Sequence, residues 1–180
     1  MKRSLQGKVP EVTYNAIISI NGAIFKVFAT KGGVERLILP EVSPLKNSSL
    51  GRKAIVRIDY HDEKKKDVYE IIYSLAEFLK DFLAGKEPGE MPLVNISNIC
   101  GFKSKVLKVV NEIPRGQVRT YSWVADKAGS PKAFQATGAA LSRNPVPIVI
   151  PCHRVIRSDG SIGGYAFGLE WKKHLLSLER

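Results

Sequence analysis

The sequence predicts an α+β protein with a small N-terminal α/β domain over residues 1–90 and a helical C-terminal domain over residues 91–180. Three observations lead to this prediction. Runs rich in β-branched and aromatic residues come first, one long helical periodicity follows them, and short helical segments separated by glycines fill the second half. A stretch with two prolines and a glycine, residues 86–96, is the expected linker.

The N-terminal half is expected to begin as a strand meander. Asn21 and Gly22 form the residue pair that best supplies the two positive-φ positions of a tight hairpin turn, so the runs on either side should pair. A helix over residues 67–85 should cover one face of the sheet, with Asp67 as its N-cap and Gly85 as its stop. Strands are expected over residues 12–20, 23–30 and 34–40, and a short apolar run follows at residues 54–58.

The C-terminal half is expected to hold a helix-turn-helix. Helices are predicted over residues 102–113 and 122–128, and Gly129 ends the second of them. A third helix over residues 131–143 should follow, because Ser130 can cap it and a proline occupies its first position. The second and third of these helices, joined by a tight glycine-containing turn, have the arrangement that is typical of this motif.

The third predicted helix has a nearly bare outer face, and small residues let a helix backbone approach a nucleic-acid groove closely. Packing against another helix of the same protein is the alternative, and it is the preferred one without the basic context described next. One face is expected to carry Ala133, Ala136, Thr137, Ala140 and Leu141, and the outward face Lys132, Gln135, Gly138, Ala139 and Ser142.

The net charge of +11 belongs mainly to the second half. Residues 1–90 hold 15 basic and 12 acidic side chains, whereas residues 91–180 hold 13 and 5. Such an excess is typical of a surface that contacts phosphates, although a solubilising face explains the charge alone equally well. No apolar run approaches the roughly 20 residues of a membrane span and no signal-peptide pattern begins the chain, so we expect a soluble, intracellular protein.

The strongest chemical signal is Cys152, which follows an apolar, proline-bracketed run and precedes His153 and Arg154. Neighbouring positive charge or an imidazole can lower the pKa of a thiol, so Cys152 has the means to become a nucleophilic thiolate. A buried, inert cysteine beside an ordinary histidine is the alternative. A Cys-His protease or acyl transferase with His61 or His174 as its base also stays open. No zinc site is expected, because the cysteines and histidines lack the usual ligand spacings.

The segment Pro151–Val155, preceded by Asn144 and followed by a glycine-rich loop and a terminal helix, resembles the O6-alkylguanine-DNA alkyltransferases. The similarity is dense from about Phe102 to Glu179 and includes the predicted helix-turn-helix. The resemblance implies a ribonuclease-H-like N-terminal domain and a winged helix-turn-helix alkyltransferase domain. It also implies DNA repair by direct reversal, in which an alkyl group moves irreversibly from a flipped-out guanine to a cysteine, without metal or cofactor.

The resemblance assigns roles to individual residues. Cys152 would be the nucleophile and acceptor, and His153 would activate it through a water, with Glu179 behind the imidazole. Asn144 would fix the local hairpin. Tyr121 would bind the flipped base, crowd its 3′ phosphate and donate a proton as the guanine leaves. The side chains of Leu141 and Tyr165 and the main chain near Val155 and Ala166 would form the pocket.

The partner implied is double-stranded DNA containing O6-alkylguanine, bound by a monomer in the cytoplasm, or in the nucleus of a eukaryote. One position departs from the family: its intercalating arginine falls at Gln135, which has no charge and no guanidinium plane. We therefore expect slower or weaker base flipping, or help from Arg143 or Lys132. The expected DNA contacts are Tyr121, Lys132, Ala133, Gln135, Ala136, Arg143 and Arg154.

Two other functions remain open. A lesion sensor of the alkyltransferase-like kind would bind damaged DNA without transfer, although such proteins generally lack the acceptor cysteine that Cys152 supplies. A helix-turn-helix regulator would bind a specific DNA sequence, and its cysteine would be incidental. Cys100 has no assigned role.

Overall fold

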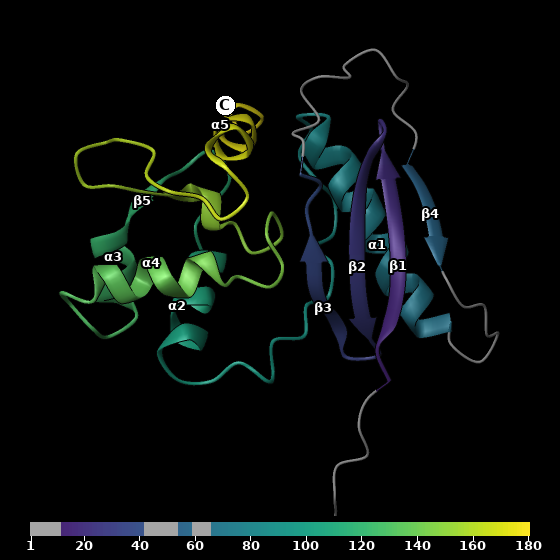
Figure 1. The fold of residues 1–180 in the computed structure, drawn as a ribbon, viewed down its shortest axis with the longest axis horizontal. Coiled ribbons are helices and arrows are strands. Elements are labelled where there is room, and N and C mark those ends of the chain that lie inside the picture. Colours follow the sequence, from purple (N-terminus) through teal and green to yellow (C-terminus); the bar gives the residue numbers. More distant parts are fainter. Residues whose placement is uncertain (1–11, 42–53, 59–65) are drawn as a thin grey trace, which may run out of the picture.

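The computed structural model describes residues 12–41, 54–58 and 66–180, and within them the chain is α+β (Figure 1). An antiparallel sheet with one long helix against it lies beside a group of shorter helices. No helix in these ranges has both the length and the apolar composition of a membrane-spanning segment.

The sheet has the strand order β3-β2-β1-β4, and each pair of neighbours is antiparallel. The predicted hairpin is confirmed: Asn21 and Gly22 have φ of 51° and 80°, and Ile20 pairs with Ala23. The strands match the expected runs with small shifts at their ends. They are β1 Tyr14–Ile20, β2 Ala23–Thr30, β3 Gly33–Ile38 and β4 Ala54–Ile58.

Helix α1, Lys66–Leu83, packs on this sheet as the sequence predicts. Its buried side chains, Ile72 and Leu79 among them, share one apolar core with strand residues such as Phe25. Asp67, the expected N-cap, lies inside the first helical turn instead, because the helix already includes Lys66. There its carboxylate still faces the positive end of the helix dipole.

The expected linker covers the outer edge of β3. The Val34 N–H donates to the carbonyl of Leu93 at 2.8 Å, and the Asn95 N–H donates to the carbonyl of Val34 at 2.9 Å. Gly33 permits this approach: its φ is +128°, and a Cβ there would lie 2.7 Å from the Leu93 oxygen. This stretch therefore binds the sheet edge as a strand-like segment.

The second half consists of short helices around a small apolar core, with the cysteine motif between them. Val106, Val110, Val124 and Leu141 are buried in that core. A parallel pair of two-residue strands, β5 Arg119–Thr120 and β6 Val155–Ile156, connects the segment after α2 to the cysteine motif. The elements are α2 Gly101–Asn111, β5 Arg119–Thr120, α3 Tyr121–Lys127, α4 Phe134–Ser142, the 3₁₀ turn η3 Cys152–Arg154, β6 Val155–Ile156 and α5 Leu169–Ser177.

Helix α4 begins at Phe134, later than the Ser130-Pro131 signal predicts. The Ala133 N–H donates to the Ser130 carbonyl at 3.0 Å, and Lys132 has φ of 86°, so Pro131 is the second residue of a β-turn. Proline at the second position and a positive φ at the third are the features of a type II turn. The proline therefore stabilises the turn before α4, and the prediction that it opens the helix was wrong.

The core under the sheet extends across the expected domain boundary. Val146, Ile148 and Trp171 belong to the same buried cluster as Phe25. The Trp171 indole N–H donates to the Pro40 carbonyl at 3.0 Å, and its ring lies edge-on to Phe25 with the centroids 6.3 Å apart. The hairpin that precedes Cys152 and the helix that follows it therefore both pack against the N-terminal half.

Candidate active site

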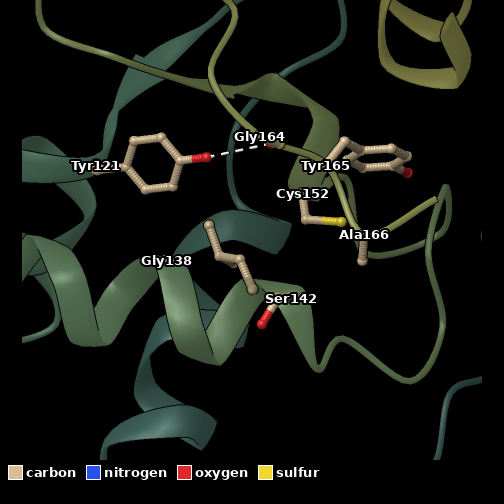
Figure 2. A pocket seen from close by; sticks show the side chains of 8 residues that line it. Tyr121, Gly138, Ser142, Cys152, Gly164, Tyr165 and Ala166 are labelled. Atoms are coloured by element: carbon tan, nitrogen blue, oxygen red, sulfur yellow. Dashed lines mark hydrogen bonds between the residues drawn. The ribbon is translucent and has the colours of Figure 1, made fainter. Parts of the chain in front are cut away.

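A cavity of about 360 Å³ opens beside Cys152, between helix α4 and the loop that precedes α5. Figure 2 shows the cysteine sulfur, the Tyr121 ring and the tip of the loop around this space. Its volume lies in the range of about 300–1,000 Å³ that is usual for small-molecule sites. The lining residues are Tyr121, Gly138, Leu141, Ser142, Cys152, Gly164, Tyr165 and Ala166.

The hairpin before the cysteine is held by Asn144, which is buried. Its side-chain oxygen accepts from the Val146 N–H at 3.1 Å, and its amide donates to the Ile150 carbonyl at 2.8 Å and to the Cys152 sulfur at 3.1 Å. Ile148 has φ of 72°, a strained conformation for a β-branched residue. A single amide thus braces a strained hairpin and contacts the sulfur.

Cys152 is 6% exposed, and its burial raises the pKa of its thiol. The hydrogen bond from Asn144, the nearby Tyr165 hydroxyl and the charge of Lys172 act in the opposite direction, but burial outweighs them. Desolvation thus disfavours the charged sulfur, whereas the sequence neighbours of Cys152 were expected to be able to lower the pKa of this thiol. Loss of the thiol proton therefore requires an acceptor close to Cys152.

His153 is fully buried, and its Nε2 lies 2.8 Å from the Glu179 carboxylate. Its Nδ1 has no hydrogen-bond partner among the described residues. Burial lowers the pKa of His153, against the effect of Glu179, so the imidazole is neutral at pH 7. A neutral ring that donates from Nε2 to the carboxylate keeps a lone pair on Nδ1, which can accept a proton.

Glu179 is 8% exposed and carries the charge of this network. Burial alone would raise its pKa, but hydrogen bonds from His153 and Arg154 and the positive charge of Arg154 outweigh burial and lower the pKa to about 2. The carboxylate also accepts a hydrogen bond from the Gly116 N–H at 3.3 Å. Glu179 follows the end of α5, and the network holds it in place.

Arg154 differs most from its expected placement. Its Nε and Nη2 donate to the two Glu179 oxygens at 2.9–3.1 Å, its Nη1 donates to the Ile113 carbonyl, and the side chain is only 12% exposed. These donors are committed inside the protein, so the expectation of a DNA contact from Arg154 is corrected. The guanidinium instead holds the carboxylate that orients His153.

Val155 also departs from expectation. It is fully buried and does not line the cavity. Its N–H donates to the Cys152 carbonyl, and its own carbonyl accepts from the Lys172 ammonium at 2.6 Å. The N–H is therefore occupied, whereas the carbonyl keeps a second lone pair, so a contact between this carbonyl and a guanine edge stays a prediction. Leu141, Tyr165 and Ala166 line the cavity as expected.

Lys172 is a site residue that the sequence reasoning missed. Its fully buried ammonium donates to the carbonyls of Val155, Ile162 and Gly164, and so ties α5 to the loop that lines the cavity. Burial lowers its pKa to about 8, although Cys152 acts to raise it. The available signal was a lysine three residues before Leu175 on the apolar side of α5.

Tyr121 opens α3 and contributes its ring to the cavity, where its hydroxyl donates to the Gly164 carbonyl at 3.5 Å (Figure 2). Burial raises the pKa of Tyr121, so the phenol keeps its proton at pH 7. His174 packs beside Trp171 on α5 and does not line the cavity, which disfavours it as the base for Cys152. The other candidate base, His61, lies outside the described residues.

The remaining expected DNA contacts lie on or beside α4, at the surface. Lys132, Gln135 and Arg143 are exposed and Ala133 is partly exposed. Ala136, expected on the inward face, is exposed as well, because burial in α4 begins at Thr137. No group of three or more His, Cys, Asp and Glu side chains suited to a metal ion occurs in the described part of the chain.

Comparisons with known proteins identify relatives of this site. A family described as "6-O-methylguanine DNA methyltransferase, DNA binding domain" matches residues 101–180. The methylated-DNA--protein-cysteine methyltransferase of Methanothermobacter thermautotrophicus is 46% identical over 110 residues, which are 60% of this chain and 61% of that protein. The protein of the same name from Methanosarcina barkeri is 53% identical over 78 residues, 43% of this chain and 49% of its own length.

The matched segment thus spans about half to three fifths of these curated relatives. Among solved structures, Mycobacterium tuberculosis OGT in complex with DNA aligns with a TM-score of 0.69 at 25% identity, over 91% of this chain and 90% of that one. This alignment includes the N-terminal half, which the family match does not reach.

Proposed function

We propose that this chain repairs alkylated DNA by direct reversal, because residues 101–180 match the family described as the DNA-binding domain of 6-O-methylguanine DNA methyltransferase. It transfers the alkyl group of an O6-alkylguanine to Cys152 once, as a methylated-DNA--protein-cysteine methyltransferase. Residues 1–90 form a ribonuclease-H-like domain and residues 91–180 a winged helix-turn-helix alkyltransferase domain. The alignment with OGT extends over both of these parts.

The observation that carries the proposal is the surroundings of Cys152. Its sulfur borders a cavity large enough for a flipped base, the Asn144 amide donates a hydrogen bond to this sulfur, and the next residue, His153, is paired with Glu179. A flipped nucleotide brings the alkyl carbon to the sulfur, and the surrounding protein keeps bulk solvent away from the reacting atoms.

The reaction balances without metal or cofactor. The thiol proton passes through a water to His153 Nδ1, and the sulfur bonds to the alkyl carbon as the bond from that carbon to guanine O6 breaks. The departing guanine carries a negative charge and takes a proton from the Tyr121 hydroxyl, and the thiol proton finally restores the phenol. The thioether on Cys152 has no route back to thiol, so each protein molecule acts once.

The substrate is double-stranded DNA, approached by α4. The small exposed residues Ala136 and Ala139 let the helix backbone approach a minor groove, while Lys132 and Arg143 lie near its two ends, where phosphates pass. Most of the affinity is then independent of sequence and falls with salt.

The two free cysteines make a matched test, because Cys152 is buried at the cavity and Cys100 is exposed beside α2. The protein is incubated with a duplex that carries one O6-methylguanine, and peptide mass spectrometry locates the methyl group. We expect one methyl group on Cys152 in the wild type and in Cys100→Ser, and none in Cys152→Ser, which still binds the duplex. Tight binding of the lesion without transfer would instead indicate a damage sensor, and binding that ignores the lesion would indicate a regulator.

A further inference from the structure

Phe134 is the first residue of α4, and its side chain is 50% exposed. The exposed positions around it on this helix are Gln135, Ala136 and Ala139. A large aromatic ring thus projects from a helix surface that is otherwise small or polar. Exposing it costs hydrophobic free energy that packing against a partner would recover.

Phe134 is on the same helical face as two residues of the cavity wall. Gly138 and Leu141, which line the cavity, follow Phe134 at four and seven residues, the spacing at which helical side chains share a face. Gln135 is rotated by about 100° from that face. Phe134 therefore stands one helical turn, about 6 Å, beyond Gly138 along the face that borders the base-sized cavity.

The backbone around Phe134 is firmly held. The turn at Ser130–Ala133 closes with a 3.0 Å hydrogen bond, and the Ala133 carbonyl accepts from both the N–H and the hydroxyl of Thr137, at 2.8 and 3.0 Å. Thr137 is fully buried, so it anchors the first turn of α4 to the core. A ring on a rigid turn can enter a narrow space without losing much backbone freedom.

A base that leaves a duplex opens a gap in the stack. Proteins that act in the minor groove fill such gaps with apolar wedges, phenylalanine among them, and an aromatic ring stacks on any base. We propose that Phe134 enters the base stack when the alkylated guanine is extruded, while Gln135 beside it hydrogen-bonds the orphaned partner base; this inference rests on the proposed function. The aromatic ring supplies the stacking plane that Gln135 lacks.

The test compares one lesion in two contexts. Single-turnover methyl transfer is measured on a duplex and on a single-stranded oligonucleotide of the same sequence, each with one O6-methylguanine, for wild type, Phe134→Ala, Phe134→Leu and Tyr73→Ala. Tyr73 is an aromatic residue of α1 that is 54% exposed, so Tyr73→Ala is the matched control. Phe134→Ala should slow transfer from the duplex roughly 10- to 100-fold, as expected for one lost aromatic–base stack, and change the single-strand rate less than about twofold. Phe134→Leu keeps an apolar wedge and should retain most of the duplex rate, and Tyr73→Ala should change neither.

A second readout needs no transfer. A duplex with 2-aminopurine next to the lesion reports local unstacking by its fluorescence, and Phe134→Ala should reduce the rise that binding produces. If Phe134→Ala slowed methyl transfer equally on both substrates, or did not slow it on the duplex, the proposal that Phe134 enters the base stack would be overturned. If the wild type transferred no methyl group from the duplex or from the single strand, the proposed function would be refuted instead. The 2-aminopurine fluorescence would then still show whether Phe134 opens the base stack.

Discussion

Replacing Glu179 by glutamine removes one negative charge from a buried network and keeps the side chain's size. In the native protein this carboxylate accepts from His153 Nε2 at 2.8 Å and from Nε and Nη2 of Arg154 at 2.9–3.1 Å. Glutamine leaves the Arg154 guanidinium, 12% exposed, without its counter-charge. Removing one partner of a buried ion pair costs about 3–5 kcal/mol.

The pKa of Glu179 gives an independent magnitude. It falls from an ordinary 4.5 to about 2 in the folded protein, a difference that corresponds to about 3 kcal/mol of stability at neutral pH. A carboxyl group with a depressed folded-state pKa stabilises the fold above its unfolded pKa and loses that contribution as pH falls toward the folded value. Near pH 3 about 2 kcal/mol of it should already be lost.

Urea unfolding of wild type and Glu179→Gln, measured near pH 7 and near pH 3, tests this reasoning. The variant should be about 3 kcal/mol less stable at the higher pH and only about 1 kcal/mol less stable at the lower. Glu170→Gln is the matched control, because Glu170 pairs with Lys173 on the exposed side of α5 and should change stability by less than about 0.5 kcal/mol. A Glu179→Gln deficit of the same size at both pH values would refute the charge-based account.

Three further substitutions have expected outcomes. Gln135→Arg adds a stacking cation beside α4 and should raise the transfer rate on duplex DNA, measured by single-turnover kinetics; an unchanged rate would remove the idea that glutamine limits flipping. Lys172→Met removes the ammonium that donates to three carbonyls, together with a positive charge near Cys152. Iodoacetamide should therefore alkylate Cys152 more slowly in this variant than in the exposed-site control Lys173→Met. Equal rates would show that the Lys172 charge does not stabilise the thiolate. Gly33→Ala forces a Cβ to within 2.7 Å of the Leu93 oxygen at a positive φ and should cost about 1–3 kcal/mol in urea unfolding, whereas wild-type stability would contradict the tight edge contact.

Local signals in the sequence predicted the local structure well. Asn21-Gly22 specifies its hairpin through the backbone freedom of two adjacent residues, and the apolar periodicity of α1 survives because a single face packs on the sheet. The Ser130-Pro131 pair failed, because proline at the first position of a helix and proline in a type II turn share the same φ. Only the backbone at Lys132 distinguishes the two.

The site residues show the same difference between contacts that are local in the sequence and contacts that are not. The placement of Asn144 beside Cys152 follows from one short hairpin, whereas the commitment of Arg154 to Glu179 depends on a contact 25 residues away. Lys172 was missed for a related reason. A lysine near the end of a chain is usually solvated, and its burial becomes evident only when three loop carbonyls converge on it.

The consumption of Cys152 by a single transfer is tested most directly by the stoichiometry of repair. Limiting protein is mixed with a large excess of duplex containing O6-methylguanine, and repaired guanine is counted over time. We expect a plateau at one guanine per protein molecule, with the matching methyl group on Cys152. Continued turnover beyond that plateau, or repair by Cys152→Ser, would contradict it.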